Sequence, residues 1–415
     1  MIEQESLLFS KKDIDILRSL ARKLVELIND SEEEKKKTLW LEHNKLQKTR
    51  PLIFCDPENG WNEIILPSDI KSENILARRW EFELRKEIFR AEKMKDDKVI
   101  EPALEISYFW IDSGWGMKEK KVGGENGGSY KWEAPLSDYA EITKLHFPRI
   151  EVDHNKTIQV YNVAKEIFTD ILEIKLKGKW WWSLGLASTL ARLRGLETIM
   201  YDMYDFPECL HKLMNFIKDG YLDMLDFLER NSLLSLNNDG TYVGSGGFGW
   251  TDELPSKNYD GLHVRTIDMW GFAESQETSQ ISPQMFEEFI FQYQIPILER
   301  FGLNCYGCCE PLDKIWEVIK KIPKLRRVSV SPWANIEFMA EKLQDKYIFS
   351  WKPNPSYLAY PQIDEDIIRK QIRKALKNTN NCVVEVILKD THTIGKNPFN
   401  IIKWCEIAKQ ESYAI

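Results

Sequence analysis

The feature that most constrains the fold is an alternation of short β-rich runs with longer amphipathic helical patterns, which begins at about residue 100. Such alternation is typical of a parallel sheet, because each return to the start of the next strand needs a crossover connection. About eight such units span roughly 300 residues, the size of a closed barrel. The sequence therefore predicts an α/β fold: a (β/α)8 TIM barrel over residues 101–415, with an N-terminal helical extension over residues 1–100.

The first hundred residues are polar and helical in pattern. Asp13 to Ile28 and Ile75 to Met94 are expected to be helices, because their apolar residues recur at helical spacing or their composition favours helix.

Further along the chain, the segment "GSGGFG" from Gly244 to Gly249 is rich in glycine but lacks the lysine and the strand–turn–helix context of a phosphate loop. We interpret this segment as a flexible lid or loop.

Composition excludes several classes of protein. The net charge of −8 argues against nucleic-acid binding, since there is no basic excess to neutralise phosphates. The sequence shows no secretory signal and no apolar run long enough to predict a membrane span. Seven scattered cysteines are typical of a reducing compartment, so we expect a cytoplasmic protein. The 15 tryptophans favour pockets for flat or methylated small molecules.

In a barrel of parallel strands the chemistry lies at the C-terminal ends of the strands. The stretch "NCYGCCEPLDK" follows such a run and places Cys305, Cys308 and Cys309 within five positions. We expect Cys305, inside the strand, to be a core residue. Thiolates past the strand end are suited to zinc, and Gly307 and Pro311 allow the turn that would let both adjacent cysteines face one ion. A redox pair is the alternative, although such pairs usually open a helix.

Other strand ends supply carboxylates, an imidazole and aromatic rings. Each of these side chains has an alternative interpretation as a solvated loop residue or as core packing. The predicted metal ligands are Glu274, Cys308, Cys309 and His392. The predicted catalytic residues are Asp239, Tyr306 and Asp390. The predicted substrate-binding residues are Trp182, Trp270, Trp333, Trp351 and Asn354.

From about Tyr161 to its C-terminus the chain resembles the uroporphyrinogen decarboxylase superfamily, which includes zinc-dependent, corrinoid-linked methyltransferases. The matching stretches follow the order of the family: "SLGLASTLARLRGLETIMYDMYDFPECLHKLM", "FAESQETSQISPQMFEEFIFQYQIPILERFG", "RRVSVSPWANIEFMAEKL" and "FSWKPNPSYLA". The last is similar to the Gly-Asn-x-x-Pro turn of the family, with Asn354 and Pro355 retained and the glycine replaced. The resemblance implies a (β/α)8 barrel with an N-terminal helical extension.

Two departures from the family pattern separate its branches. The basic "RQAGR"-type segment with which the decarboxylases bind substrate carboxylates is missing, which disfavours porphyrinogen decarboxylation. In the methyltransferases a His-x-Cys pair and a later Cys hold zinc. Cys308 matches the first cysteine, Tyr306 stands in place of the histidine, and Asp390 and His392 stand where the later cysteine would be. The resemblance then implies a rearranged zinc set of Glu274, Cys308 and His392, with Cys309 in reserve.

The resemblance thus implies a zinc-dependent methyltransferase that moves a methyl group between a small methylated substrate or thiol and a corrinoid. The corrinoid that this resemblance implies is expected on a separate partner protein. Two alternatives remain: a metal-free decarboxylase or lyase that uses Asp239 and Asp390, or a barrel that binds a ligand without catalysis. Zinc content distinguishes the first function from the other two.

Overall fold

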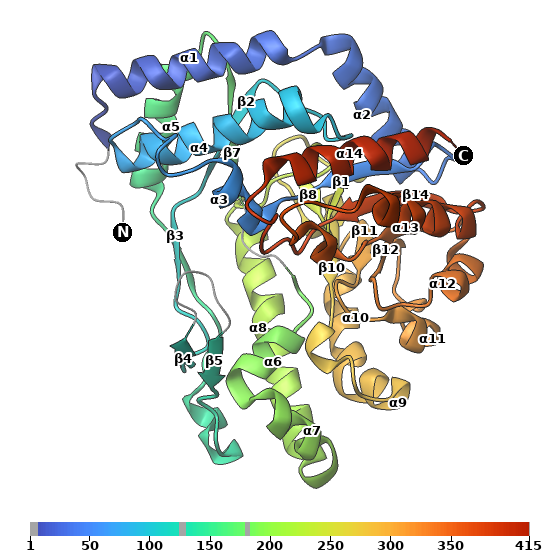
Figure 1. Ribbon diagram of the computed structural model, residues 1–415. Coiled ribbons are helices and arrows are strands. Elements are labelled where there is room, and N and C mark those ends of the chain that lie inside the picture. The colour runs from blue at the N-terminus through green and yellow to red at the C-terminus, as the bar shows by residue number, and fades with distance from the viewer. Residues whose placement is uncertain (1–6, 124–129, 179–182, 415) are drawn as a thin grey trace.

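The computed structural model describes residues 7–123, 130–178 and 183–414 as a mixed α/β fold (Figure 1). Its centre is a six-stranded sheet in which all neighbouring strands are parallel. Across the sheet the order is β1 (Leu52–Cys55), β14 (Val383–Leu388), β13 (Ile348–Trp351), β12 (Leu325–Val330), β11 (Leu303–Tyr306) and β10 (Trp270–Ala273). The predicted α/β class with a parallel sheet is confirmed.

In the central sheet, the first strand of the sequence pairs with the last strand of the sequence. β1 pairs with β14, with Leu52 opposite Glu385 and Cys55 opposite Leu388. From β10 to β14 each strand pairs with the next one along the chain. Two more parallel strands, β2 (Ala103–Ser107) and β7 (Glu173–Lys177), pair with each other. Because β1 belongs to the central sheet, the first hundred residues contribute a strand as well as helices.

Helices cover the sheet and form a separate N-terminal layer, in which α1, α4 and α5 lie together at the upper edge of Figure 1. The N-terminal helices are α1 (Lys11–Leu27), α2 (Asp30–Asn44), α3 (Trp61–Ile64), α4 (Ile75–Phe89) and α5 (His154–Phe168). The others are α6 (Ala187–Arg194), α7 (Leu196–Asp205), α8 (Pro207–Arg230), α9 (Pro283–Phe286), α10 (Gln292–Leu298), α11 (Trp316–Ile319), α12 (Ile336–Leu343), α13 (Glu365–Asn378) and α14 (Pro398–Tyr413). Three antiparallel pairs complete the fold: β3 (Trp110–Asp112) with β6 (Ile150–Val152), β4 (Lys120–Gly123) with β5 (Tyr130–Glu133), and β8 (Tyr242–Val243) with β9 (Gly247–Phe248).

The N-terminal layer has the packing that its sequence predicts. α1 begins after Ser10, whose hydroxyl accepts a hydrogen bond of 3.1 Å from the backbone N–H of Asp13 and so caps the helix. Leu17, Ala21 and Leu24 recur at helical spacing and are buried in a cluster shared with α4 and α5. In the described part of the chain, no helix combines the length and the apolar character needed to cross a bilayer.

The glycine-rich segment is a buried hairpin, so the expectation of a flexible lid is wrong. Residues 243–250 are all buried. Gly244 has a φ of +64°, and a Cβ there would lie 2.8 Å from the Cβ of Cys305 in β11. Gly247 packs equally closely on the guanidinium of Arg327, and Gly246 on Ile387 of β14. The glycines are needed because this hairpin packs tightly against three strands of the sheet.

A buried network of charges supports the hairpin from β12 and β14. Arg327 Nε lies 3.0 Å from Glu385 Oε1, and His43 Nε2 lies 3.1 Å from Glu385 Oε2. Arg327 also donates a hydrogen bond of 2.7 Å to the side-chain oxygen of Asn44. Burial alone would raise the pKa of Glu385, but the charge of Arg327 and the hydrogen bond from His43 outweigh it and lower that pKa. These internal charges are therefore compensated within the protein.

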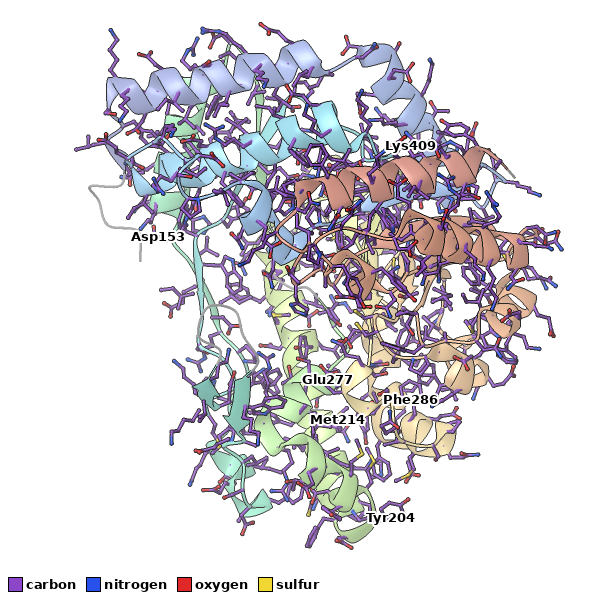
Figure 2. All side chains as sticks on the ribbon, in the orientation of Figure 1. Asp153, Tyr204, Met214, Glu277, Phe286 and Lys409 are labelled. Atoms are coloured by element: carbon purple, nitrogen blue, oxygen red, sulfur yellow. The ribbon has the colours of Figure 1, made fainter. Side chains whose placement is uncertain are left out.

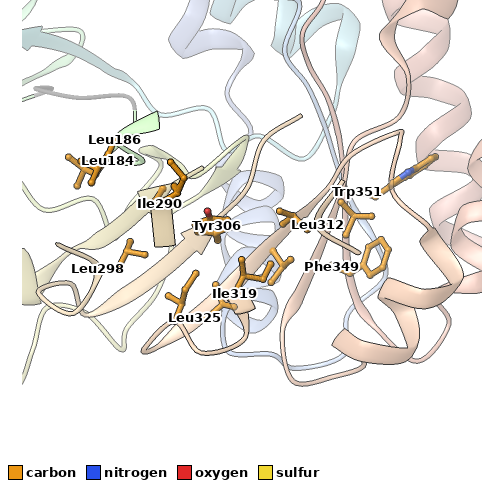
Figure 3. Close-up of a cluster of buried hydrophobic side chains, with 14 of the residues drawn as sticks. Leu184, Leu186, Ile290, Leu298, Tyr306, Leu312, Ile319, Leu325, Phe349 and Trp351 are labelled. Carbon is orange, nitrogen blue, oxygen red and sulfur yellow. The ribbon is translucent and has the colours of Figure 1, made fainter. Parts of the chain in front are cut away.

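The largest hydrophobic cluster lies between the sheet and its covering helices (Figure 3). Leu298, Leu312, Ile319 and Phe349 are fully buried in it, and Tyr306 lies among them with 1% of its surface exposed. Because the same strands bury apolar side chains here and present polar groups at their ends, the core fixes the positions of the loops that follow β10 and β11.

Candidate functional site

The loop after β11 brings two adjacent thiols to the C-terminal end of the sheet. Gly307, with a φ of +93°, turns the chain directly after the strand, and a side chain there would collide with Leu312. Glu310 then holds the turn. Its Oε2 accepts a hydrogen bond of 2.9 Å from the backbone N–H of Cys308, and its Oε1 accepts one of 2.9 Å from the N–H of Ser275. A single carboxyl thereby ties the loop after β11 to the loop after β10.

Three polar groups lie close to the Cys308 thiol, and a fourth lies close to its neighbour Cys309. Its Sγ lies 3.6 Å from Cys309 Sγ, 3.4 Å from the hydroxyl of Ser245 and 3.9 Å from Lys389 Nζ. Cys309 Sγ in turn lies 3.6 Å from Asp390 Oδ2. The groups come from three places in the fold: the loop after β11, the buried hairpin and the end of β14. Only 3% of the Cys308 surface is exposed.

These neighbours favour the thiolate form of Cys308. The hydrogen bond from Cys309 lowers the pKa of Cys308, and the charge of Lys389 and the hydroxyl of Ser245 add to this effect against the opposing effect of burial. The same hydrogen bond raises the pKa of Cys309, as do burial and the negative charge of Cys308. Of the two thiols, Cys308 is therefore the one that loses its proton first.

Lys389 remains an ammonium in this environment. Burial would lower its pKa, but the charges of Cys308, Asp390 and Glu58 outweigh burial and raise it. Its Nζ lies 3.5 Å from Asp390 Oδ1 and donates a 3.4 Å hydrogen bond to Ser245 Oγ. The centre is thus a thiolate–ammonium pair closed on one side by the hairpin.

A second polar cluster lies in the loop after β10. Burial, together with the neighbouring carboxyls Glu277 and Glu310, raises the pKa of Glu274 to about 9. Glu274 Oε2 accepts a 3.0 Å hydrogen bond from the N–H of Gln276, whereas its buried Oε1 receives none in the described structure. Glu277, labelled in Figure 2, also has a buried oxygen without a hydrogen bond. This cluster contrasts with the thiol centre, because no ammonium or guanidinium forms an ion pair with these carboxyls among the described residues.

The predicted metal ligands are not assembled as one set. Cys308 and Cys309 lie together, and Asp390 joins them, but Glu274 lies in the carboxyl cluster. His392 is exposed, and its Nδ1 lies 3.4 Å from the side-chain amide of Asn59. Within residues 7–123, 130–178 and 183–414 no group of three or more His, Cys, Asp or Glu side chains is arranged to hold a metal ion.

The predicted catalytic residues lie in three different environments. Asp390 borders the thiol centre. Tyr306 is buried below it, where its hydroxyl donates a 2.9 Å hydrogen bond to Gln294 and lies 3.1 Å from the hydroxyl of Ser275. Asp239 forms a 2.6 Å ion pair with Lys177 at the end of β7. Of the three, only Asp390 contacts the thiols.

The predicted aromatic substrate contacts are also dispersed. Trp270 and Trp351 are each 2% exposed and pack in hydrophobic clusters, and Trp270 donates a 2.9 Å hydrogen bond to a backbone carbonyl. Trp333 is 69% exposed on the surface. Asn354 caps the short helical turn of Pro355–Leu358. Trp182 lies outside the described residues.

Three residues of the thiol centre were not selected from the sequence: Ser245, Glu310 and Lys389. Glu310 and Lys389 each occur within the polar stretch that follows a strand, so their position was a usable signal. Ser245 occurs in the glycine-rich run that predicted a lid. Its role depends on where the hairpin packs, which no local pattern records.

Comparisons with known proteins add little to this geometry. No family model matches the chain, and no curated protein matches its sequence. Among solved structures, a methyltransferase from Methanosarcina mazei is similar over 91% of this chain and 99% of its own, with 11% sequence identity and a TM-score of 0.48. A likeness at this level carries no argument for fold or function. Both are argued from the residues of this chain.

Proposed function

We propose that the chain is a methyltransferase in which the Cys308 thiolate accepts and passes on the methyl group. The observation that carries this proposal is the buried thiolate–ammonium pair of Cys308 and Lys389 at the C-terminal ends of parallel strands. A thiolate is the nucleophilic form of cysteine, and an adjacent cation is a common means of maintaining it at neutral pH. The resemblance of the sequence to corrinoid-linked methyltransferases supports the choice of a methyl group as the group transferred.

We further propose that the parallel strands form a closed (β/α)8 barrel with an N-terminal helical extension. The eight strands would be β1, β2, β7 and β10 to β14. Two backbone hydrogen bonds support this closure: Asp97 N–H to Ile53 O at 2.8 Å links the chain before β2 to β1, and Leu184 N–H to Phe272 O at 2.9 Å links the chain after β7 to β10. The pairing of β1 with β14 supplies the remaining junction.

The proposed first step is an in-line displacement at the methyl carbon. The sulfur electron pair of Cys308 forms the S–CH3 bond while the bond from methyl to its leaving group breaks, and the leaving group keeps that electron pair. In the second step a nucleophilic acceptor takes the methyl group, and the S–C electron pair returns to sulfur. The ammonium of Lys389 stabilises the regenerated thiolate, and the proton on Cys309 does not move in either step.

The residues do not fit the zinc centre that the resemblance implies. Two thiolates on one tetrahedral zinc, each at about 2.3 Å, would lie roughly 3.8 Å apart, close to the 3.6 Å between the two Sγ atoms. However, the described residues offer no group of three ligands, and Lys389 already places a positive charge beside both Cys308 and Asp390. We therefore derive no step through zinc. The metal stays a prediction that the zinc content of the purified protein tests.

We also propose, from the resemblance, that a corrinoid on a separate cytoplasmic protein exchanges the methyl group with Cys308. The reduced state of the cysteines supports a reducing compartment: all seven are free. The other exchange partner would be a small methylated compound or thiol. Nothing basic in the composition favours a nucleic-acid partner.

The test is to incubate the full-length protein with methylcobalamin and, separately, with methylated amines, and to map mass changes on its cysteine peptides. We expect one added methyl group, on the peptide that contains Cys308 and Cys309, and its loss in Cys308→Ser. Cys309→Ser should still gain the methyl group, and Cys209→Ser is the matched control at a distant thiol. Methylation that persists in Cys308→Ser, or none with any donor, contradicts the proposal.

A further inference from the structure

A cavity of about 240 Å³ lies beside the loop after β10, away from the thiols themselves. Glu274 and Met224 line its buried part, and Trp115 and Tyr221 form its aromatic side. Since a water molecule takes about 30 Å³ of liquid, the volume suits a compound of only a few non-hydrogen atoms. The cavity therefore selects small ligands by size.

The buried part of this cavity holds a carboxyl oxygen that has no hydrogen-bond partner among the described residues. Glu274 is 1% exposed, and its Oε1 receives no hydrogen bond from any described residue. A buried oxygen in this condition is costly, and a ligand N–H that reaches it would relieve that cost. Gly185, which also lines the cavity, lies so close to the backbone of Glu274 that no side chain fits at that position.

The aromatic side suits a methylated cation. The rings of Trp115 and Tyr221 have their centroids 5.6 Å apart at an angle of 48°. Tilted aromatic faces attract an ammonium electrostatically and contact its methyl groups. Gly220 of α8 makes this arrangement possible, because a Cβ there would lie 2.6 Å from the Trp115 ring.

The rim of the cavity carries two side chains of opposite charge that do not form an ion pair with each other. Arg192 and Asp112 both line it, and in the described structure neither forms an ion pair within 4.0 Å, although the charge of Arg192 acts to lower the pKa of Glu277. Among the described residues, the Arg192 guanidinium forms one hydrogen bond, a long one of 3.4 Å to the carbonyl of Ser188. A guanidinium in this state is ready to bind a carboxylate in a bidentate manner.

We propose that the cavity binds a small zwitterion, an N-methylated amino acid that keeps at least one N–H on its ammonium group. The ammonium group favours the carboxylate form of Glu274, so that Glu274 releases its proton on binding and Oε1 accepts the ligand N–H. The methyl groups lie against Trp115 and Tyr221, and the carboxylate binds Arg192. In this complex Glu274 positions the ammonium group, and Arg192 positions the carboxylate. This inference goes beyond the proposed function, because Cys308 is not among the described residues that line the cavity.

The test is calorimetric binding of three probes to the full-length protein: N,N-dimethylglycine, dimethylamine and trimethylglycine. We expect N,N-dimethylglycine to bind most tightly, because dimethylamine lacks the carboxylate and trimethylglycine lacks the N–H. Arg192→Gln should weaken the binding of N,N-dimethylglycine about tenfold while leaving dimethylamine unchanged, and Arg192→Lys should restore part of the loss. Arg192 is exposed, so these variants should fold normally.

Cys308→Ser separates this inference from the proposed function. If the zwitterion site exists, the variant binds N,N-dimethylglycine as the wild type does but is not methylated. No binding of the zwitterion by the wild type, alongside methylation of Cys308 by methylcobalamin, overturns the inference and leaves the function standing. Binding that Arg192→Gln does not weaken also overturns the inference. Binding without methylation of Cys308 by any donor contradicts the function alone.

Discussion

The loops after β10 and β11 bury ionisable groups side by side but balance them differently. In the loop after β11 the protein supplies every partner, since Lys389, Ser245 and Cys309 all favour the thiolate of Cys308. In the loop after β10, the carboxyl of Glu274 forms no ion pair with any described residue, and one of its oxygens has no hydrogen bond there. A centre whose charges are compensated internally is ready to react, whereas an uncompensated one requires a ligand. The comparison therefore assigns chemistry to the thiol loop and recognition to the carboxyl loop.

The sharpest test of this division is loss of the nucleophile. Cys308→Ser should lower the initial rate of methyl incorporation by about a thousandfold or more, because serine at this position is not ionised. Cys309→Ser removes one hydrogen bond to the thiolate and should lower the rate by less than about tenfold. Mass spectrometry of the cysteine peptides measures both. If Cys309→Ser is the more damaging change, the nucleophile has been assigned to the wrong thiol.

The second prediction concerns the pH dependence of stability at Glu274. The folded protein holds a proton on Glu274 up to a pKa of about 9, whereas the unfolded chain releases it near 4.3. Between these values the unfolded state binds fewer protons, so the folded state loses stability as pH rises. Glu274→Gln removes this dependence. Relative to wild type its free energy of unfolding should gain up to about 1.4 kcal/mol per pH unit.

Urea denaturation of wild type and Glu274→Gln at pH 5 and pH 8 measures this gain. Glu299→Gln, an exchange on an exposed helix end, is the control and should leave the difference between the two pH values unchanged. Parallel pH curves for wild type and Glu274→Gln would mean that the carboxyl is compensated after all, and the contrast between the two loops would fail.

The third prediction tests the ammonium of the thiol loop. Lys389→Gln removes the positive charge that favours the thiolate, so the pKa of Cys308 should rise. Alkylation by iodoacetamide should then slow about tenfold at neutral pH and recover as the pH is raised. Lys370→Gln, on the exposed face of α13, is the matched control. A rate that stays low at every pH would point to lost access instead of a shifted pKa.

The smallest effect is expected from the buried hairpin. Ser245→Ala deletes the hydroxyl that lies 3.4 Å from Cys308 Sγ and should slow alkylation two- to threefold, since one weak hydrogen bond to the thiolate is lost. The smaller side chain leaves the hairpin glycines undisturbed. The same pH profile measures the change. An effect larger than that of Lys389→Gln would give the hairpin, and not the ammonium, control of the thiolate.

The sequence predicts much of the fold because the relevant signals are local. Alternating β-rich and helical runs give the parallel α/β class, and the apolar spacing of Leu17, Ala21 and Leu24 gives the packing face of α1. The position of β1 was harder, because a four-residue apolar run followed by Asp-Pro is typical of an edge strand or a loop. Its pairing with β14 depends on residues more than 300 positions away.

The candidate site shows the same limit more strongly. The cysteines Cys308 and Cys309 can be found from their position after a strand, and so can Asp390. Ser245 cannot, because glycines that allow close packing have the same sequence pattern as glycines that allow mobility. The expected ligand set, including Glu274 and His392, was chosen only because each residue follows a strand in the sequence. The structure places these two side chains in different environments.

The most direct test of the account is the thiolate absorbance of the full-length protein as a function of pH, measured as the difference between wild type and Cys308→Ser. We predict a titration midpoint for Cys308 below the value of about 8.5 of a free cysteine. A midpoint at or above that value would show that Cys308 is an ordinary buried thiol and would contradict its role as the methyl-accepting group.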